Sequence, residues 1–561
     1  MPIYFTPENR LISWYGDNAI KKYRPVISLL LIKKYGSGTH SETDIVDALF
    51  FILDWYQDKF MELLNNEKEL TFYQGIFLLH EMSSMLHQER PNESPLQNMD
   101  RKEFAVYRRI LKLILEQACD IPLISGTEAS LEYMKSKESL IDELLYLGDL
   151  IFSFSNLLAA QDMIEDCVDL KFTPDNLFYF TFKHQYGHVI SELDKSYNSH
   201  LAKAVTGEDS LEDFIVAIKD CMGIDYGAVI GTIEAIHNHF EAGKFALDEW
   251  NIYPINLKNL YGIPVEKGTV FLKGLTLSKD NKMSLKEAVY RPHKINKYLY
   301  RPFLIWNVDG NDLTFVGDKI FIESIHSLCT NAFGWGKYPH EWESDCFKKY
   351  IQRKVSFNDK ILEDQAEKLL ATNSILYDRN IRSLRKWNNH GLNIDNEKCG
   401  EIDFIFIYEN KIFIADSKHQ ITRYDMNNYK NDFAYFEANK KSYNKTLDRK
   451  LQYLNSKLCD IQEHFQVLTN DRAFKLPSTI IDGIFIVNTP TFVMHNNQFR
   501  IYTLKSFEEL ITGSFRDESY NIMIDEGNQF KVLQIDYPYF RKPEYRVFNY
   551  EDYEDDNLES L

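Results

Sequence analysis

Residues 400–418, GEIDFIFIYENKIFIADSK, decide the fold of the C-terminal part of this chain. Two apolar runs, Glu401–Tyr408 and Lys411–Lys418, flank Glu409-Asn410, the only polar pair between them that can form a tight turn. Because the runs are apolar at consecutive positions, both faces of each strand should be buried. The stretch therefore predicts a β-hairpin in the centre of a sheet.

The register of this hairpin brings three charged side chains to one face. With a two-residue turn, Tyr408 pairs with Lys411, and five positions farther from the turn Asp403 lies opposite Asp416. Directly opposed residues have Cβ atoms roughly 5 Å apart. Strand alternation places Lys418 on the same face as Asp416. The sequence therefore predicts two acids and one amine together at the ends of two apolar strands.

This combination of side chains suits the hydrolysis of a phosphodiester. Mg²⁺ or Mn²⁺ binds oxygen ligands, and Mg²⁺ needs only one or two carboxylates besides water and substrate phosphate. Lys418 would then orient or deprotonate the attacking water, or stabilise charge on the phosphate. A purely structural explanation is a pair of strand-end acids with a salt-bridging lysine. If the two carboxylates repel each other, Asp416→Asn should raise the melting temperature of the metal-free protein.

The segment resembles the PD-(D/E)XK nuclease superfamily, also called restriction-endonuclease-like. That family places an acid at the start of its second strand and an acid-x-lysine on its third, which Asp403 and Asp416-Ser417-Lys418 match. The literal Pro-Asp of the family is absent, because Ile402 precedes Asp403. The resemblance covers residues 350–515. It implies a core of helix, three-stranded meander, helix and further strand, and a Mg²⁺-dependent nuclease activity.

The family commonly adds a glutamate on the preceding helix, within a Glu-x-x-apolar-x-x-Leu pattern. Glu363–Leu369 fits this pattern on a helix expected at about Asn358–Ala371, and Glu367 is the competing glutamate. Either glutamate is also compatible with a solvated helix face. The catalytic residues that the resemblance implies are Asp403, Asp416, Lys418 and Glu363, with the three acids as metal ligands.

A row of basic residues follows on a helix predicted at about Ser442–His464. Lys441, Lys445 and Arg449 are four residues apart, and Tyr443 and Lys450 flank them as weaker candidates. The opposite stripe of this helix is apolar, with Leu447, Leu451, Leu454, Leu458 and Ile461. If the stripe packs on the sheet, the basic row faces outward and can bind a phosphate backbone, although a simple solvated face explains it equally well.

The pattern along the chain predicts a multidomain protein with four parts. Residues 1–250 read as a mainly α region, because apolar residues recur at three- and four-residue steps, as in Ile45, Ala48, Leu49, Ile52, Leu53 and Tyr56. Residues 251–345 form a connecting α/β segment, 346–515 a restriction-endonuclease-like α/β domain with a mixed central sheet flanked by helices, and 516–561 an extension with an acidic tail.

Individual strands and caps are also predicted in the second half. Val270–Leu272 is strand-like, and Leu304–Val308 and Leu313–Val316 form a hairpin. Later strands are expected at Thr479–Asn488 and Phe499–Leu504. Ser506 is predicted to cap a short helix at 507–510.

Composition limits the classes of protein that this chain can belong to. The 561 residues are 44% hydrophobic and 14% aromatic, which excludes disorder as the main state. The net charge is −19, but residues 351–470 hold 19 Lys+Arg and 17 Asp+Glu, a net of +2. No run approaches roughly 18 apolar residues, no secretory signal is visible, and seven scattered cysteines fit a reducing compartment. These features predict a soluble, cytoplasmic protein that does not enter membranes.

Other catalytic motifs do not appear in the sequence. No Gly-x-x-x-x-Gly-Lys-Ser/Thr loop and no Gly-x-Ser-x-Gly elbow occurs. His184 and His188 have helical ligand spacing, but Gln185 stands where a zinc protease has glutamate. Core or surface histidines explain this pair better than a metal site.

Two classes of function follow. The first is a metal-dependent nuclease that cleaves DNA in preference to RNA, in a chain whose layout is similar to bacterial restriction, repair and antiviral defence effectors. The second is a nucleic-acid-binding or helical interaction protein with an inactive nuclease fold. The presence of Asp403, Asp416 and Lys418 together favours the first. The helical half would bind a protein partner, sense a signal or form a homo-oligomer, and its residues do not select among these.

Overall fold

A computed structural model places the chain in two compact units. The first, here the helical unit, comprises Met1–Ala159, Leu170–Phe180 and Gly207–Val355, and therefore includes the predicted connecting segment 251–345. The second, here the sheet unit, comprises Ala160–Asp169, Thr181–Thr206 and Ser356–Leu561. The structure describes residues 15–89, 101–126, 131–163, 167–182, 208–225, 227, 228, 231, 234, 235, 238, 248–291, 294–388, 390–421, 423, 425–438, 442–495, 497–515, 519–525, 529–536 and 545–549. Lys441, His184, His188 and the acidic residues from 550 onward lie outside them.

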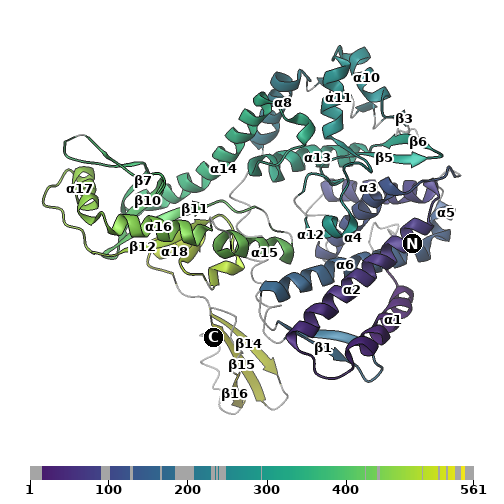
Figure 1. The fold of residues 1–561 in the computed structure, drawn as a ribbon, viewed down its shortest axis with the longest axis horizontal. Coiled ribbons are helices and arrows are strands. Elements are labelled where there is room, and N and C mark those ends of the chain that lie inside the picture. Colours follow the sequence, from purple (N-terminus) through teal and green to yellow (C-terminus); the bar gives the residue numbers. More distant parts are fainter. Residues whose placement is uncertain are drawn as a thin grey trace. The chain divides into compact units, whose positions relative to one another are not determined.

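Helices dominate the N-terminal part of the chain, as predicted (Figure 1). Ser41 begins α2 with a capping box, in which its hydroxyl accepts from the Asp44 amide and the Asp44 carboxylate accepts from the Ser41 amide. The predicted apolar stripe of this helix is buried, from Ile45 to Tyr56. The helices of this part are α1 (Asp17–Tyr35), α2 (Glu42–Asn66), α3 (Leu70–Glu89), α4 (Arg101–Gln117), α5 (Leu131–Ser136), α6 (Glu138–Met163), α8 (Glu208–Met222), α10 (Ile252–Tyr261), α11 (Val265–Gly274), α12 (Leu285–Tyr290) and α13 (Asp318–Asn331).

Small sheets complete the helical unit. The predicted hairpin is confirmed as β5 (Phe303–Val308) and β6 (Asn311–Phe315), which pair antiparallel. Its turn residues Asp309 and Gly310 have φ of 49° and 84°, the left-handed values that a two-residue hairpin turn requires. The sheet order is β3-β6-β5-β4, with β3 at Asp248–Glu249 and β4 at Thr276–Leu277. A separate pair, β1 (Val168–Phe172) and β2 (Phe178–Phe182), has only its residues 170–172 and 178–180 in this unit.

The predicted strand at Val270–Leu272 is wrong, because these residues lie within helix α11. Phe271 and Leu272 are buried, whereas Val270 is 41% exposed, so burial follows one helical face rather than a strand. A three-residue apolar run is too short for its period to be read from sequence.

Two features of the helical part differ from the composition argument. Among the described helices, α6 is long and apolar enough to cross a membrane by length and composition, and 67% of its most apolar 18-residue window is buried inside the structure. Cys221 and Cys346, 125 residues apart, form a disulfide between α8 and the start of α14 (Asp345–Thr372). Scattered cysteine spacing did not indicate this pairing.

The C-terminal half contains a mixed five-stranded sheet flanked by helices. Its order is β13-β12-β11-β10-β7, with antiparallel pairing of β7 with β10 and of β10 with β11, and parallel pairing of β11 with β12 and of β12 with β13. The register of the central hairpin is confirmed, since Tyr408 pairs with Lys411 and Phe404 with Ala415. The strands are β7 (Leu376–Ile381), β10 (Ile402–Tyr408), β11 (Lys411–Lys418), β12 (Ile481–Val487) and β13 (Arg500–Thr503).

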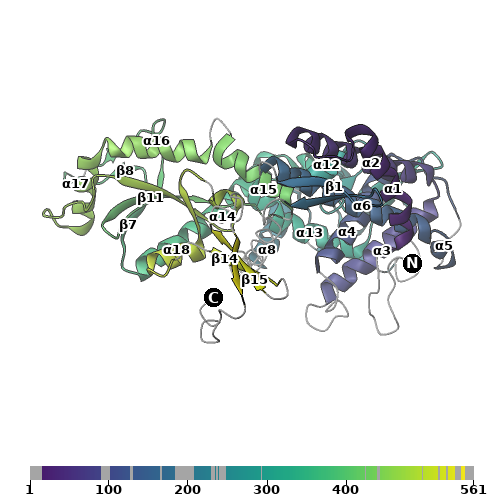
Figure 2. The same cartoon turned by 90° about the horizontal axis from the view of Figure 1, so that it is seen from below.

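Each face of this sheet has its own helical cover, as Figure 2 shows. On one face, Ile405 and Ile414 pack with Leu447 and Leu454 of α16 (Tyr443–Asn455) and with α17 (Leu458–Thr469). On the other face, Phe404, Phe406 and Ala415 pack with α14 and with α18 (Leu504–Ile511). Strand alternation therefore assigns residues 403, 414 and 416 to the α16 face.

Several predicted boundaries in this half need correction. The helix expected at Asn358–Ala371 begins earlier, at Asp345, and the one expected at Ser442–His464 is two helices divided near Ser456. The cap of α18 is Thr503, whose hydroxyl accepts from the Ser506 amide, so the predicted cap at Ser506 is wrong. The prediction also lacks β7, the small β8–β9 pair (Ser383–Leu384 and Leu392–Asn393) and the three-stranded sheet β14 (Ser519–Asp525), β15 (Gln529–Asp536) and β16 (Tyr545–Asn549).

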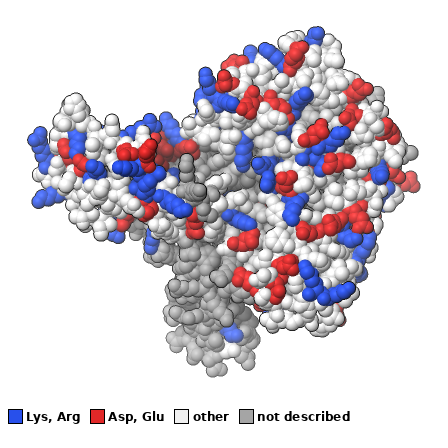
Figure 3. All heavy atoms as spheres, in the orientation of Figure 1, with Lys and Arg blue, Asp and Glu red and all other residues white. Residues whose placement is uncertain are grey.

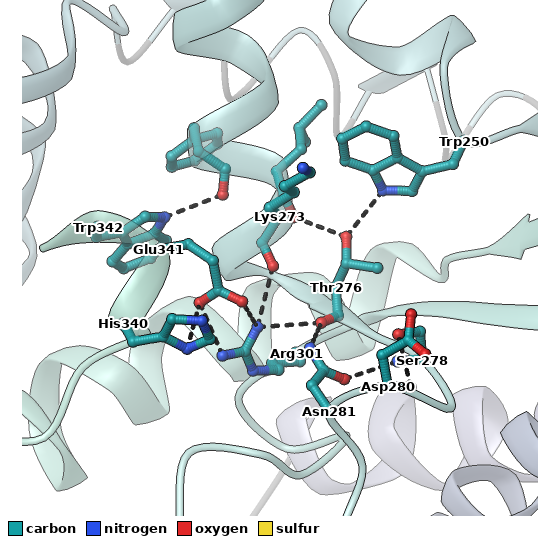
Figure 4. A network of polar contacts seen from close by, with 12 residues as sticks. Trp250, Lys273, Thr276, Ser278, Asp280, Asn281, Arg301, His340, Glu341 and Trp342 are labelled. Carbon is teal, nitrogen blue, oxygen red and sulfur yellow. Dashed lines mark hydrogen bonds and ion pairs between the residues drawn. The ribbon is translucent and has the colours of Figure 1, made fainter.

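A buried arginine ties together the core of the helical unit (Figure 4). The Arg301 side chain is fully buried and donates to both carboxylate oxygens of Glu341, each at 2.9 Å. It also donates to the backbone carbonyls of Lys273 and Thr276 at 3.0 and 3.1 Å. Arg301 thus links the end of α11, strand β4 and the turn His340–Trp342.

Removal of the Glu341 charge should destabilise the helical unit, because Glu341→Gln leaves a buried guanidinium without its counter-charge. Breaking a buried ion pair from one side costs roughly 3–5 kcal/mol. Urea unfolding followed by tryptophan fluorescence measures this loss. Glu343→Gln is the matched control, since the Glu343 side chain is 51% exposed and its replacement should change stability little. Equal stability of the two variants would contradict a structural role for the pair.

Candidate functional site

The hairpin register brings Asp403 and Asp416 together on the α16 face. Phe404 pairs with Ala415, so the next position outward on each strand carries one of the two acids. The Asp403 carboxylate accepts the backbone N–H of Ser417 through Oδ2 at 2.7 Å. This contact connects the start of β10 to the end of β11 at the predicted place.

Two lysines compensate the charge of Asp416. The Lys450 ammonium lies 2.6 Å from Asp416 Oδ1, and the Lys418 ammonium lies 3.1 Å from Asp416 Oδ2. The Asp416 side chain is only 1% exposed, and that of Lys450 is 7% exposed. The predicted residues Asp403, Asp416 and Lys418 therefore meet in a buried cluster that also contains Lys450.

Lys450 belongs to this cluster because of its place on α16. It is three residues after Leu447 and four before Leu454, so it lies within the apolar stripe of the helix that packs on the sheet. The sequence pattern instead predicts Lys450 as a weaker candidate that flanks the outward basic row. A lysine inside an apolar stripe was the available sign that it faces a buried acid.

The two acids differ in their tendency to ionise. Burial, together with the charge of Asp416, raises the pKa of Asp403 to about 6. Burial acts the same way on Asp416, but the Lys418 and Lys450 ammonium groups outweigh it and hold the pKa of Asp416 below its usual value. Burial opposes the charge of Lys418, yet Asp416 and Asp403 outweigh it and raise the pKa of Lys418. Asp416 is thus the ionised partner of the pair, and Lys418 is a cation.

This asymmetry changes which acid bears the repulsion. Neutralising Asp416 would leave two largely buried ammonium groups without their counter-charge, so the expectation that Asp416→Asn stabilises the metal-free protein no longer follows. Burial and the charge of Asp416 disfavour the charged form of Asp403. Neutralising Asp403 therefore removes an unfavourable charge and should stabilise the metal-free protein. The sequence could not show this difference because it depends on the docking of α16.

The glutamates predicted on the preceding helix contact an arginine of β7. Arg379 Nη2 lies 3.2 Å from Glu363 Oε2, and Arg379 Nη1 lies 2.8 Å from Asp364 and also contacts Glu367. Tyr377 donates a further hydrogen bond to Glu367 at 3.2 Å. Helix α14 covers the sheet face opposite to Asp416, so the structure joins Glu363 and Glu367 to Arg379 rather than to the acidic pair.

Another acid of α14 lies in the field of Lys418. Burial raises the pKa of Asp359, and the Lys418 ammonium opposes that shift. Asp359 is one helical turn before Glu363, and its charge in turn raises the pKa of Glu363 after the larger effect of burial. The Glu-x-x-apolar-x-x-Leu pattern does not include Asp359, because it starts four residues later, at Glu363.

The chain that follows Lys418 is held by buried polar contacts. The Asn488 side chain accepts the Gln420 amide at 2.6 Å and donates back to the Gln420 carbonyl at 2.9 Å. Arg423, fully buried, donates to Asp432 at 2.6 Å, and Thr491 donates to the same Asp432 oxygen at 2.6 Å. These bonds anchor the end of β11 and so limit the freedom of Lys418.

The predicted basic row is described for two of its three members. Lys445 and Arg449 are both exposed on α16, as the packing of the leucine stripe requires, whereas Lys441 lies outside the described residues. Figure 3 shows basic and acidic side chains interspersed on the visible face of the protein. The row is therefore available to solvent.

The donors at Asp403 and Asp416 fit a hard divalent cation. Both are carboxylates, and Asp416 Oδ2 is a buried oxygen with no hydrogen bond among the described residues, although Lys418 forms an ion pair with it. In the described part of the chain no three or more His, Cys, Asp and Glu side chains converge on one point. A cation here would take its remaining ligands from water and substrate phosphate.

Comparisons with known proteins supply no relative for this chain. No protein-family model, no curated protein and no solved structure matches it.

The two acids should affect stability in opposite directions in EDTA. The pKa of Asp403 is raised to about 6 from 3.8, so its contribution to stability is present below about pH 4 and is lost as the pH rises through 6. Asp403→Asn should therefore raise the melting temperature at pH 7.5 and have little effect at pH 4. Asp416→Asn should lower the melting temperature at pH 7.5, because the pKa of Asp416 is lowered by its two lysines. Thermal melts at both pH values check the signs, and a loss of stability in both variants at pH 7.5 would contradict the assignment.

Proposed function

We propose that this protein is a metal-dependent nuclease whose site is built from Asp403, Asp416 and Lys418. The observation that carries the proposal is the meeting of two carboxylates on facing strands with a lysine ammonium 3.1 Å from one of them. Environments that push the pKa values of neighbouring acids apart are characteristic of catalytic sites. We further propose that the sheet unit is a restriction-endonuclease-like domain, a proposal that the helix, the antiparallel β7-β10-β11 meander and the parallel strand β12 support.

The reaction would be hydrolysis of a phosphodiester. A water oxygen forms a bond to phosphorus, one ester P–O bond breaks, and the products are a phosphate monoester and a hydroxyl. Mg²⁺ or Mn²⁺, when bound, would supply Lewis-acid polarisation of the phosphate and of a bound water. Asp403 and Asp416 would hold the cation, and the backbone N–H of Ser417 orients the Asp403 carboxylate.

The raised pKa of Lys418 selects between its possible roles. An ammonium cannot accept a proton, so in the metal-free protein Lys418 is suited to stabilise negative charge on the phosphate rather than to deprotonate water. Lys450 positions Asp416 from the opposite side through the 2.6 Å contact with Oδ1. Glu363, which the resemblance implies as the acid of the preceding helix, is bound to Arg379 instead.

The substrate is proposed to be nucleic acid, with DNA preferred to RNA. The local charge of residues 351–470 is +2 within a chain of net charge −19, so this stretch, which carries Asp403, Asp416 and Lys418, is repelled less by a polyanion than the rest of the chain. By analogy with restriction and defence effectors, the helical unit would regulate or direct the cleavage through a partner or a second copy of the chain.

Loss of Lys418 should reduce cleavage by about 10²–10⁴-fold, the range for removing a group that assists proton transfer or stabilises charge. Plasmid DNA, linear DNA and RNA are incubated with the protein in Mg²⁺, Mn²⁺ or EDTA, and Lys418→Ala is compared with the parent. Lys411→Ala is the matched control, because Lys411 is an exposed lysine at the other end of the same strand.

Asp403→Asn separates chemistry from folding in the same assay. It should abolish cleavage while the melting temperature without metal stays the same or rises. Binding without cleavage by the parent in every metal would instead support the alternative, a non-cleaving nucleic-acid-binding protein. Equal cleavage by parent, Asp403→Asn and Lys418→Ala would reject the site.

The basic pair on α16 should contribute to the salt dependence of binding. Each lost phosphate contact lowers the slope of log K against log salt by roughly 0.7–0.9. Lys445→Ala combined with Arg449→Ala should therefore lower the slope by about 1.5, measured by fluorescence anisotropy in EDTA. Lys475→Ala combined with Lys505→Ala, two exposed lysines elsewhere in the sheet unit, should leave the slope unchanged. An unchanged slope in the Lys445→Ala, Arg449→Ala variant would show that these two residues do not contact the phosphate backbone.

A further inference from the structure

One tyrosine lies beside Lys418, and a second tyrosine stacks on the first. The ring of Tyr443, the first residue of α16, is 5.3 Å from the Lys418 ammonium. The ring of Tyr435 stacks on Tyr443 with 6.2 Å between centroids and 17° between planes. Lys418, Tyr443 and Tyr435 therefore form a continuous series that leads away from the proposed reaction centre.

The inner tyrosine is fixed by the core. Phe436, which is fully buried, meets the Tyr443 ring edge-on at 5.0 Å and 88°. Phe436 in turn packs against Phe485 of β12 at 5.2 Å. Tyr443 is thus held on its side toward the sheet, as a rigid surface rather than a freely rotating ring.

The outer tyrosine remains open to solvent. Tyr435 is 48% exposed, whereas its neighbour Phe436 is buried. Both lie in a π-helical turn, Ala434–Ala438, a rare local structure that is found mostly at functional sites. The turn places the Phe436 ring in the core and presents the preceding ring, Tyr435, to solvent, where it stacks on Tyr443.

We propose that Tyr435 and Tyr443 form a stacking surface for an unpaired nucleobase of the substrate strand bound at Asp403, Asp416 and Lys418. This inference rests on the proposed nuclease function and adds the class of substrate, which is single-stranded nucleic acid or a strand opened at the site. Every base has a π-face that stacks on an aromatic side chain, whereas the bases inside a duplex already cover one another. Lys418 beside the platform supplies the cation for the adjoining phosphate.

Binding in EDTA tests the platform without cleavage. Anisotropy of labelled 12-nucleotide single-stranded DNA, single-stranded RNA and duplex DNA is measured with the full chain. Stacking is worth about 1–3 kcal/mol per base, so Tyr435→Ala should weaken single-strand binding about 5–150-fold and change duplex binding less than about twofold. Tyr435→Phe should bind like the parent, because the ring face is retained.

Two further variants distinguish stacking from packing. Tyr435→Leu keeps an apolar cover over Tyr443 but has no aromatic face, so it should lose affinity as Tyr435→Ala does. Ile480→Ala removes another exposed apolar side chain of the sheet unit, 66% exposed, and should have no effect. Comparison of the DNA and RNA arms identifies which strand the platform prefers.

The outcomes separate this proposal from the proposed function. Single-strand affinity that is unchanged in Tyr435→Ala, retained in Tyr435→Leu, or lost equally for duplex would overturn the platform, even if the protein cleaves DNA. Tyr435-dependent binding of single strands by a protein that cleaves nothing would uphold the platform and reject the nuclease.

Discussion

Asp416 is a carboxylate buried in the middle of a sheet, and the sheet unit can hold it there because an ammonium group approaches each of its oxygens. An isolated charge in a protein interior costs several kcal/mol, so burial of Asp416 requires both Lys418 and Lys450. Lys418 comes from the same strand, two residues away, whereas Lys450 comes from α16. The helix is thereby tied to the strand by charge as well as by its leucine stripe.

The same arrangement makes the two acids unequal. Among the described residues, Asp403 accepts a hydrogen bond only from the Ser417 backbone N–H. Burial and the neighbouring charge of Asp416 therefore raise its pKa to about 6. Asp416 has two cations and stays ionised. A divalent cation bound at this site would find Asp416 already ionised. Its positive charge would also favour ionisation of Asp403. If a divalent cation binds these carboxylates, as we propose, Lys418 and Lys450 would compete with it for Asp416, and the position of α16 would affect its affinity.

The helical unit also contains a buried charged side chain, Arg301, for which we propose no catalytic role. Arg301 is fully buried and donates through its Nη atoms to Glu341 and to two backbone carbonyls, and it joins segments that are far apart in the sequence. Its contacts are directed to backbone and to one carboxylate, which is the pattern of a structural crosslink. In the sheet unit, Asp416 Oδ2 is a buried acceptor that lacks a hydrogen bond among the described residues, although the Lys418 ammonium lies 3.1 Å from it.

The sequence by itself determined the hairpin, its register and the meeting of Asp403, Asp416 and Lys418, because a two-residue turn and a strand period of two leave one arrangement when both strands are apolar. It also determined the helical character of the N-terminal part, where long stripes such as Ile45–Tyr56 have a clear period. The sequence did not determine the secondary structure of short segments such as Val270–Leu272, because three residues do not define a hydrophobic period. Only the tertiary structure decided that Lys450 faces Asp416 and that Glu363 is bound to Arg379. Those contacts join residues 34 and 16 positions apart, and their geometry depends on which face of the sheet each helix covers.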